Sequence, residues 1–305
     1  MRIIVIFITL ISLASCKMPN QNKFQLFDKH IWKAMLDYRL EEYENSLQNF
    51  QQAFKIYKED NSTNYLYAIA SALHVKKIDE AKNLLKEAVI ETSFSKEYFQ
   101  NFEEYNKFQN TSNFKILIGL LENLNTDEYN RRESKIQDSI INTIIESDQN
   151  IRKGSVDGIT MKRVDSVNVR NLIKFTEQYG WHDKGWILLW HQRTSFKEDN
   201  WIWNYFRPKI NNEISKGNLR KDFWVIFEDQ ASIIDSKQQI YGSYLNNLDR
   251  YPIDEIEKVD SRRQNVGLPP LWYLEVVYHY SLPEGYSRTE TYPFLNEYLK
   301  KFNKQ

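Results

Sequence analysis

Apolar and small residues recur with a spacing of 35 positions between residues 28 and 91. Paired antiparallel helices need small residues where they approach closely and large apolar residues between those points. The pattern therefore predicts first helices at residues 32–40 and 65–75, and second helices at residues 42–57 and 79–91. The matching positions are Tyr43, Ser46, Phe50 and Ala53 in the first copy and Ile78, Ala81, Leu85 and Ala88 in the second.

This repeat resembles a tetratricopeptide array, whose usual period is about 34 residues. Only two copies are visible, whereas such arrays usually need three or more, or a packed cap. The alternative is a general bundle of helical hairpins with an accidental period. In both cases, residues 28–108 are expected to be helical and to offer a surface to a protein partner.

Helical patterns return in residues 133–305, after a connecting region at residues 109–132. Isoleucines at helical spacing predict a helix at residues 133–152, which Gly154 and Gly158 end. Asp165 is expected to cap a helix at residues 166–179 that ends at Gly180. Further helices are predicted at residues 185–195, 201–215, 223–236, 254–266, 271–280 and 291–302.

A short aromatic and β-branched pattern at residues 240–244 interrupts these helices. Together with turn residues at 246–249 and a second stretch at 250–253, it predicts one small β-hairpin. The fold class is therefore expected to be mainly α. Tetratricopeptide-like helical hairpins come first, and an α-helical C-terminal domain with this one hairpin follows.

The first residues have the pattern of a bacterial lipoprotein signal. Met1 and Arg2 precede an apolar run at residues 3–13, which is shorter than the roughly 20 residues of a membrane-spanning helix. The sequence Leu13-Ala14-Ser15-Cys16 then has the form of a lipobox. We therefore expect residues 1–15 to be removed, the thiol of Cys16 to be lipidated, and residues 16–27 to form a polar tether.

A lipid on Cys16 is expected to hold the protein at a membrane of the cell envelope, because several acyl chains together bind firmly. In bacterial lipoproteins with similar Asn, Lys, Ile and Tyr usage, an acidic cluster after the cysteine favours display on the cell surface. No such cluster follows Cys16. This favours the periplasmic face of the outer membrane.

Composition and charge remove several classes of protein from consideration. The chain has 41 basic and 41 acidic residues, and loss of Arg2 with the signal lowers the basic count to 40. A nucleic-acid-binding protein normally carries a basic excess or stripe, and neither is present. Cys16 is the only cysteine, so no intrachain disulfide can form. The sequence contains no metal or cofactor motif, so neither is expected.

Six short sequence fragments occur in the second half of the chain. Each alone is weak evidence for a protein family, but their occurrence in this order is specific. They are Asp148-Gln149-x-x-Arg152, Asp165-x-x-Asn168, Gly180-Trp181, His191-Gln192, Gln239-x-Tyr241-Gly242 and Arg262-Arg263-x-x-x-Gly267-Leu268-Pro269-Pro270. In this order they resemble an uncharacterised family of bacterial secreted proteins and lipoproteins, a domain of unknown function. The resemblance covers about residues 136–274 and implies no reaction. Members of the family often have an amide residue where this chain has Tyr244.

Two polar residues are predicted to lie on apolar helix faces. Asp148 continues the isoleucine stripe of its helix, and Arg152 is its expected partner because residues four apart share a face. His191 lies beside the core face of its own helix. Each has a structural interpretation as a satisfied buried group and a functional one as an acid, base or ligand contact in a pocket.

We expect eight polar residues to converge on one cluster, since buried polar groups need partners. The candidates for catalysis are His191, Asp148 and Asp165. If the cluster opens to a cleft, Arg262 or Arg263 is expected to bind an anionic group of a substrate or partner. The candidates for binding are Arg152, Asn168, Gln192, Gln239, Tyr241, Arg262 and Arg263. The eight residues of the expected cluster are Asp148, Arg152, Asp165, Asn168, His191, Tyr241, Arg262 and Arg263.

Three functions are compatible with these patterns. A binding or scaffold lipoprotein is favoured, because the repeats offer a surface and no catalytic signature is complete. One alternative is a hydrolase-like enzyme that uses His191 and Asp148 in a C-terminal pocket. The other is glycan or peptidoglycan binding, because seven of the eight tryptophans lie between Trp181 and Trp272; helix packing is the simpler interpretation of these tryptophans.

The lipobox predicts covalent lipidation at Cys16. When the full chain is expressed in a bacterium with a labelled fatty acid, we expect label on the wild-type protein and none on Cys16→Ala. Label that survives this substitution, or an unlabelled wild-type protein, contradicts the assignment.

Overall fold

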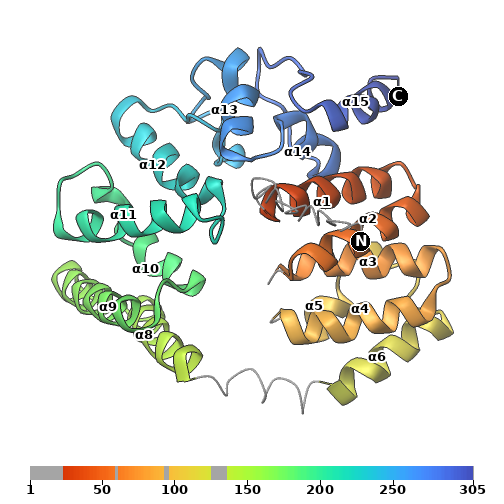
Figure 1. Cartoon of the computed structure of the whole chain (residues 1–305), viewed down its shortest axis with the longest axis horizontal. Coiled ribbons are helices and arrows are strands. Elements are labelled where there is room, and N and C mark those ends of the chain that lie inside the picture. Colours follow the sequence, from red (N-terminus) through yellow and green to blue (C-terminus); the bar gives the residue numbers. More distant parts are fainter. Residues whose placement is uncertain (1–22, 59–60, 93–95, 125–135, 305) are drawn as a thin grey trace, which may run out of the picture.

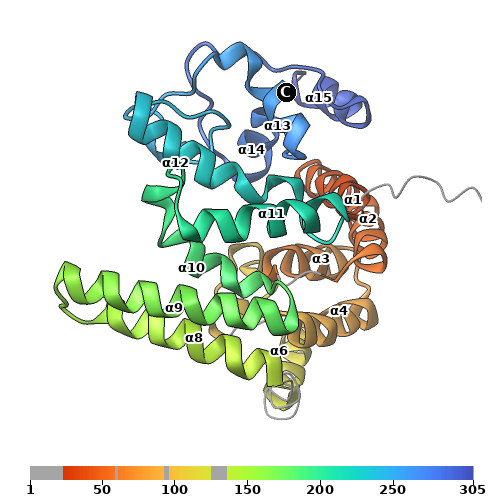
Figure 2. The ribbon, with the colours of Figure 1, turned by 60° about the vertical axis from the view of Figure 1, so that its left-hand side comes forward.

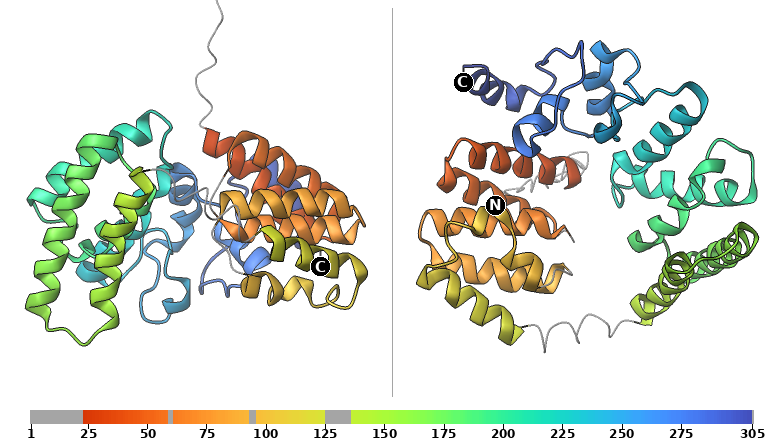
Figure 3. Two further views of the ribbon diagram at one scale, coloured as in Figure 1. Left: turned by 90° about the horizontal axis from the view of Figure 1, so that it is seen from below. Right: turned by 180° about the vertical axis from the view of Figure 1, so that it is seen from behind.

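Helices arranged in a ring make up the protein (Figure 1). The computed structural model describes residues 23–58, 61–92, 96–124 and 136–304, so the signal, Cys16 and most of the tether lie outside the described residues. The expectation of a mainly α fold is confirmed. The same ring is visible from behind in Figure 3.

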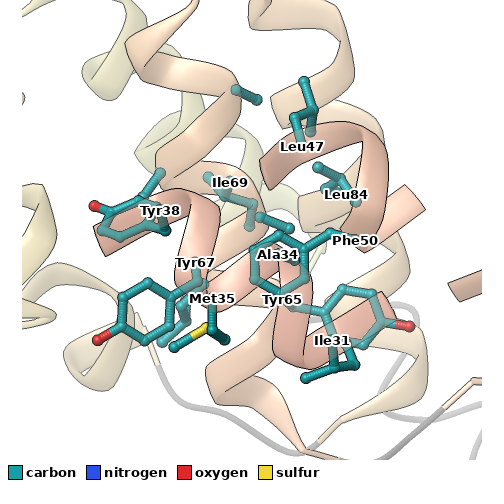
Figure 4. Packing of buried hydrophobic residues seen from close by; sticks show 14 of the residues in the cluster. Ile31, Ala34, Met35, Tyr38, Leu47, Phe50, Tyr65, Tyr67, Ile69 and Leu84 are labelled. Atoms are coloured by element: carbon teal, nitrogen blue, oxygen red, sulfur yellow. The ribbon is translucent and has the colours of Figure 1, made fainter. Parts of the chain in front are cut away.

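The N-terminal side of the ring is a stack of helices. Side chains from α1 to α4 fill one interior, in which Met35, Phe50 and Ile69 are fully buried (Figure 4). The small residues of the repeat allow close approach, and the hydroxyls of Ser46 and Ser71 lie 2.9 Å apart. The helices are α1 (Lys23–Arg39), α2 (Tyr43–Ile56), α3 (Ser62–His74), α4 (Ile78–Glu91), α5 (Lys96–Gln100) and α6 (Ser112–Leu124). The expected connecting region thus contains a helix, α6, which buries Phe114, Leu117 and Leu121.

Five helices form the opposite side of the ring. They share a second core around Trp203, Phe206 and Phe227, each fully buried. Figure 2 shows α8 and α9 as a long hairpin that extends away from the rest of this side. The helices are α8 (Ile136–Lys153), α9 (Gly158–Tyr179), α10 (Trp186–Trp190), α11 (Trp201–Ser215) and α12 (Val225–Ser236).

The last three helices follow, and two of them pack against the N-terminal stack. These helices are α13 (Val259–Val266), α14 (Leu271–Tyr278) and α15 (Asn296–Phe302). Residues of α14 and α15 belong to the same apolar core as α1 to α4. Trp32 of α1 contacts the rings of Tyr273, Tyr292 and Phe294. The first core is therefore built from both ends of the sequence.

Polar contacts reinforce the packing of the C-terminal segment against α1, here called closure of the ring. The guanidinium of Arg39 donates to the carbonyl of Val277 at the end of α14, at 2.6 and 3.0 Å. Tyr298 donates to the buried carboxylate of Asp37 at 2.7 Å. Arg220, which precedes α12, pairs with both oxygens of Asp28 at 2.6 and 2.7 Å. Burial nevertheless raises the pKa of Asp28 to about 6, although Arg220 opposes this shift.

Three local predictions are wrong. The first helix was expected at residues 32–40, after a tether at residues 16–27, but α1 already begins at Lys23 and buries Phe24 and Phe27. Asp165 caps no helix, because α9 begins earlier, at Gly158, where Asp157 accepts hydrogen bonds from the backbone of Ile159 and Thr160. No β-hairpin forms in residues 240–253. The described residues there contain only a single parallel bridge, between Gln239 and Ile253.

Buried side chains explain why the hairpin is absent. The carboxylate of Asp229 accepts the backbone N–H groups of Ile240, Tyr241 and Ser243 at 2.6 to 2.8 Å. The side chain of Gln239 bonds to the backbone of Tyr244 and Tyr251. These side chains satisfy backbone groups that a ladder between strands would otherwise use.

No helix among the described residues is both long and apolar enough to cross a membrane.

Closure of the ring predicts a large loss of stability from Trp32→Ala. The substitution removes a side chain that is 8% exposed and that contacts three rings from the C-terminal segment. We expect the free energy of unfolding to fall by about 3 to 5 kcal/mol in urea titrations followed by circular dichroism. The control Ile116→Ala, at an exposed helical position, should change it by less than about 0.5 kcal/mol. Equal effects of the two substitutions contradict the role assigned to Trp32.

Candidate functional site

The eight polar residues expected to converge do not form one cluster. Asp148, Arg152, Asp165 and His191 are connected on α8, α9 and the end of α10. Tyr241, Arg262 and Arg263 lie around α13 and the segment that follows α12. Among the described residues, no hydrogen bond or ion pair joins the two groups. The expectation of a single cluster is therefore wrong, because the members of each group bond to one another or to the backbone beside them.

The first group, here called the Asp148 cluster, consists of Asp148, Gln149, Arg152, Asp165 and His191. Arg152 donates to the carboxylate of Asp148 at 2.8 Å, which confirms the predicted pair, and to Asp165 at 2.6 Å. Gln149 donates to Asp148 at 2.8 Å, and Nδ1 of His191 lies 2.9 Å from its Oδ2. The carboxylate of Asp148 is 1% exposed. It therefore receives three donors, which offset the cost of its burial.

Two further candidates lie near this cluster in the sequence. Asn168 follows Asp165 by one turn of α9 and is buried, and its Nδ2 has no hydrogen-bond partner. Gln192 is half-buried at the end of α10. Neither residue, nor any member of the Asp148 cluster, lines the four cavities identified on the described surface.

The second group, here called the Arg263 cluster, organises the loop after α12. It consists of Asp229, Gln239, Tyr241, Asp260, Arg262 and Arg263. Arg263 donates to the carbonyls of Pro269 at 2.6 Å and Tyr241 at 2.7 Å. Arg262 donates to the carbonyl of Ile240 at 2.8 Å, and Tyr241 donates to Glu228 at 2.8 Å. The adjacent arginines thus hold the loop and the turn before α14 together.

A cavity of about 720 Å³ lies over the Arg263 cluster. Arg263 is 3% exposed and Gly242 is buried. Gly242 has a φ of +72°, at which other residues are strained, and a Cβ there would lie 2.6 Å from the end of the Ile253 side chain. We call this cavity the motif pocket; its lining residues are Val225, Gly242, Ser243, Tyr244, Leu245, Asn246, Asn247, Arg263, Leu268, Leu274, Tyr278 and Tyr280.

Burial changes the acidity of several groups in and around the pocket. It lowers the pKa of Arg263 to about 10, against the opposing effects of Asp260 and Asp229. It raises the pKa of the Tyr244 hydroxyl to about 12. Burial, with Glu228 nearby, also raises the pKa of Tyr241. At neutral pH the pocket therefore offers one cation and neutral phenol groups.

Sequence reasoning missed two carboxylates that support this pocket. Asp229 lies on the buried stripe of α12 with Val225 and Ile233, spaced four residues apart. The stripe argument that identified Asp148 applies equally to this position. Asp260 is also buried and accepts from the backbone of Leu271 and the hydroxyls of Tyr286 and Thr289. Its helix, α13, is too polar for such a stripe to be visible.

In the parts of the chain that the structure describes, no group of three or more His, Cys, Asp or Glu side chains could hold a metal ion. No family model, no curated protein and no solved structure matches the chain.

The Asp148 cluster predicts a strong dependence of stability on its central carboxylate. Asp148→Ala leaves the donors of Arg152, Gln149 and His191 without their shared acceptor. We expect a loss of about 3 kcal/mol in the free energy of unfolding. Asp235→Ala, which removes an exposed carboxylate paired with Lys197, should cost less than about 1 kcal/mol. A small effect at Asp148 shows that the cluster does not hold α8, α9 and α10 together.

Proposed function

We propose that the protein is a lipoprotein of the bacterial envelope that binds a small ligand in the motif pocket. Its role on this proposal is binding, or scaffolding of a complex, and not catalysis. Cys16 carries the lipid that holds the protein at the membrane. The described part of the chain then folds outside the bilayer, and no nucleic acid is involved.

The observation that carries this proposal is the meeting of separate motif fragments at one cavity. Gly242 comes from the Gln-x-Tyr-Gly fragment, and Arg263 and Leu268 come from the Arg-Arg-x-x-x-Gly-Leu-Pro-Pro fragment. Tyr244, the position at which this chain departs from the family it resembles, also lines the pocket, and its hydroxyl donates to Gln230 at 3.0 Å. Residues that build a pocket from distant segments are the usual arrangement of a ligand site.

A protein partner is compatible with the same arrangement. Helices α2 and α4 are covered only in part, and polar residues of α2 line a second cavity of about 410 Å³ with Lys33 and Tyr298. This surface belongs to the helical region at residues 28–108, where a partner is expected. A pulldown with this face as bait is a separate test from ligand binding in the motif pocket.

The geometry supports the enzyme alternative less well. Asp148 fixes the orientation of the His191 ring, as the acid of a catalytic dyad does. However, among the described residues His191 is hydrogen-bonded to no hydroxyl that could act as nucleophile. Arg152, Gln149 and His191 all bond to the Asp148 carboxylate. The contacts are those of a buried network that stabilises its domain.

One observation favours the glycan alternative as a second candidate. Trp186 and Trp190 are stacked with ring centroids 5.6 Å apart, and Arg193 lies 4.3 Å from the Trp190 ring. Trp186 also lines an open cavity of about 460 Å³ with Asn142 and Lys184. An aromatic face beside polar side chains is suited to a sugar ring. Binding of peptidoglycan fragments that Trp186→Ala abolishes would support this candidate.

The proposed ligand site predicts that filling the motif pocket removes a bound compound. Ser243 is exposed on the pocket lining, so Ser243→Trp should occupy the cavity without disturbing a core. We expect native mass spectrometry of the mature protein, purified from envelopes in detergent, to show a small-molecule adduct on the wild type and none on Ser243→Trp.

The matched control is Ser155→Trp, at an exposed position between α8 and α9. It should retain the adduct of the wild-type protein. Equal occupancy of Ser243→Trp and wild type contradicts the assignment of the motif pocket.

A further inference from the structure

Arg263 is a buried cation held by neutral groups. Its side chain donates to two backbone carbonyls, those of Pro269 and Tyr241. It forms no ion pair with any carboxylate of the described residues, although the residue is only 3% exposed. Buried charges in proteins are normally paired, because an isolated one loses its hydration without an equivalent gain.

Asp260 and Asp229 are the two carboxylates that most favour the charged form of Arg263. Neither serves as its direct counter-ion. Both oxygens of Asp229 accept backbone N–H groups. Both oxygens of Asp260 accept from a backbone N–H or from hydroxyls. They influence Arg263 electrostatically, but neither forms a direct bond with it.

The neighbouring Arg262 shows the ordinary arrangement. It is half-buried at the surface, and its Nη1 lies 3.9 Å from the carboxylate of Glu255. The two arginines therefore differ in their surroundings. Only Arg263 combines deep burial, no paired carboxylate and a position on the wall of a cavity.

We propose that the ligand of the motif pocket carries an anionic group, a carboxylate or a phosphate ester, which pairs with the guanidinium of Arg263. This inference rests on the proposed function, because it names the class of ligand for the same pocket. A guanidinium suits both anions, since its planar donors match two oxygens at once. Because burial leaves the pKa of Arg263 at about 10, the group is charged at neutral pH.

The rest of the pocket indicates the other part of the ligand. Ser243, Asn246 and Asn247 are exposed at the pocket and offer hydrogen bonds. Tyr278 and Tyr280 are 42% and 36% exposed and present aromatic surface. We therefore assign to the pocket a small anionic compound with an apolar or ring-shaped body. An inorganic anion would contact Arg263 but would leave the aromatic part of the pocket unfilled.

The test compares anionic and neutral compounds of the same shape. Benzoate and phenyl phosphate are titrated calorimetrically into the mature protein, with benzamide as the neutral match of benzoate. We expect the anions to bind and benzamide to bind at least about tenfold more weakly, as loss of a charge-assisted pair implies. The comparison of benzoate with phenyl phosphate distinguishes the two anion classes.

Charge substitutions at the exposed Asn247 avoid disturbing the bonds that Arg263 makes to the backbone. Asn247→Asp should weaken anion binding by about tenfold and Asn247→Lys should strengthen it by a similar factor, because each adds a charge at the pocket. Asn110→Asp, at an exposed position on the other side of the ring, should leave binding unchanged. Arg263→Gln should abolish the preference for anions, whereas Arg263→Lys should retain part of it.

Two results overturn the inference. One is equal binding of benzoate and benzamide, or anion binding that is indifferent to the charge at residue 247. The other is no binding of either anion at about 10 mM, where even a weak single pair would be detected. In both cases the proposed function is judged separately, by the adduct that Ser243→Trp should remove.

Discussion

The structure depends on the burial of α1 from two sides. On one side α1 packs against α2 and α3, and on the other it meets α14 and the segment that precedes α15. Two helical hairpins cannot cover both faces of such a helix alone, and short arrays of this kind need a cap. Here the cap comes from the other end of the chain. Closure of the ring is thus a requirement of the first core.

The same closure builds the motif pocket. One face of α14 places Tyr273 and Val277 in the first core, and residues Leu274 and Tyr278 of the same helix line the pocket. The opposite wall belongs to the loop that Asp229 and Arg263 hold in place. Arg39 of α1 binds the last turn of α14, so the N-terminal helices contact the helix that forms one pocket wall. The repeat-like helices and the candidate site are parts of one unit.

Buried aspartates accept many of the hydrogen bonds that connect one helix to another or to a loop. Asp37 connects α1 to α15 through Tyr298, and Asp148 connects α8 to His191. Asp229 and Asp260 fix the loops on either side of α13. Each accepts two or more donors, so its charge remains bonded when water is removed. Arg263 is the one buried cation among the described residues, and its direct partners are neutral carbonyls.

The sequence by itself determined the elements whose causes are local. Periodicity located α2, α4 and α11 to within a residue or two, because an amphipathic face repeats with the helix itself. It also determined the pair of Asp148 and Arg152, since a spacing of four residues places both on one face of α8. The start of α9 was misplaced, because Asp157 and Asp165 are equally good caps by residue type.

Only the tertiary structure decided how these elements meet. The hairpin was replaced by a loop because Asp229, from a different segment, supplied the acceptors that a partner strand would have supplied. The polar residues separated into two clusters because the helices that carry them belong to different sides of the ring. The missing counter-ion of Arg263 is equally invisible in the sequence. A side chain's burial and partners depend on segments brought together from distant parts of the chain, and no local pattern of residues encodes that meeting.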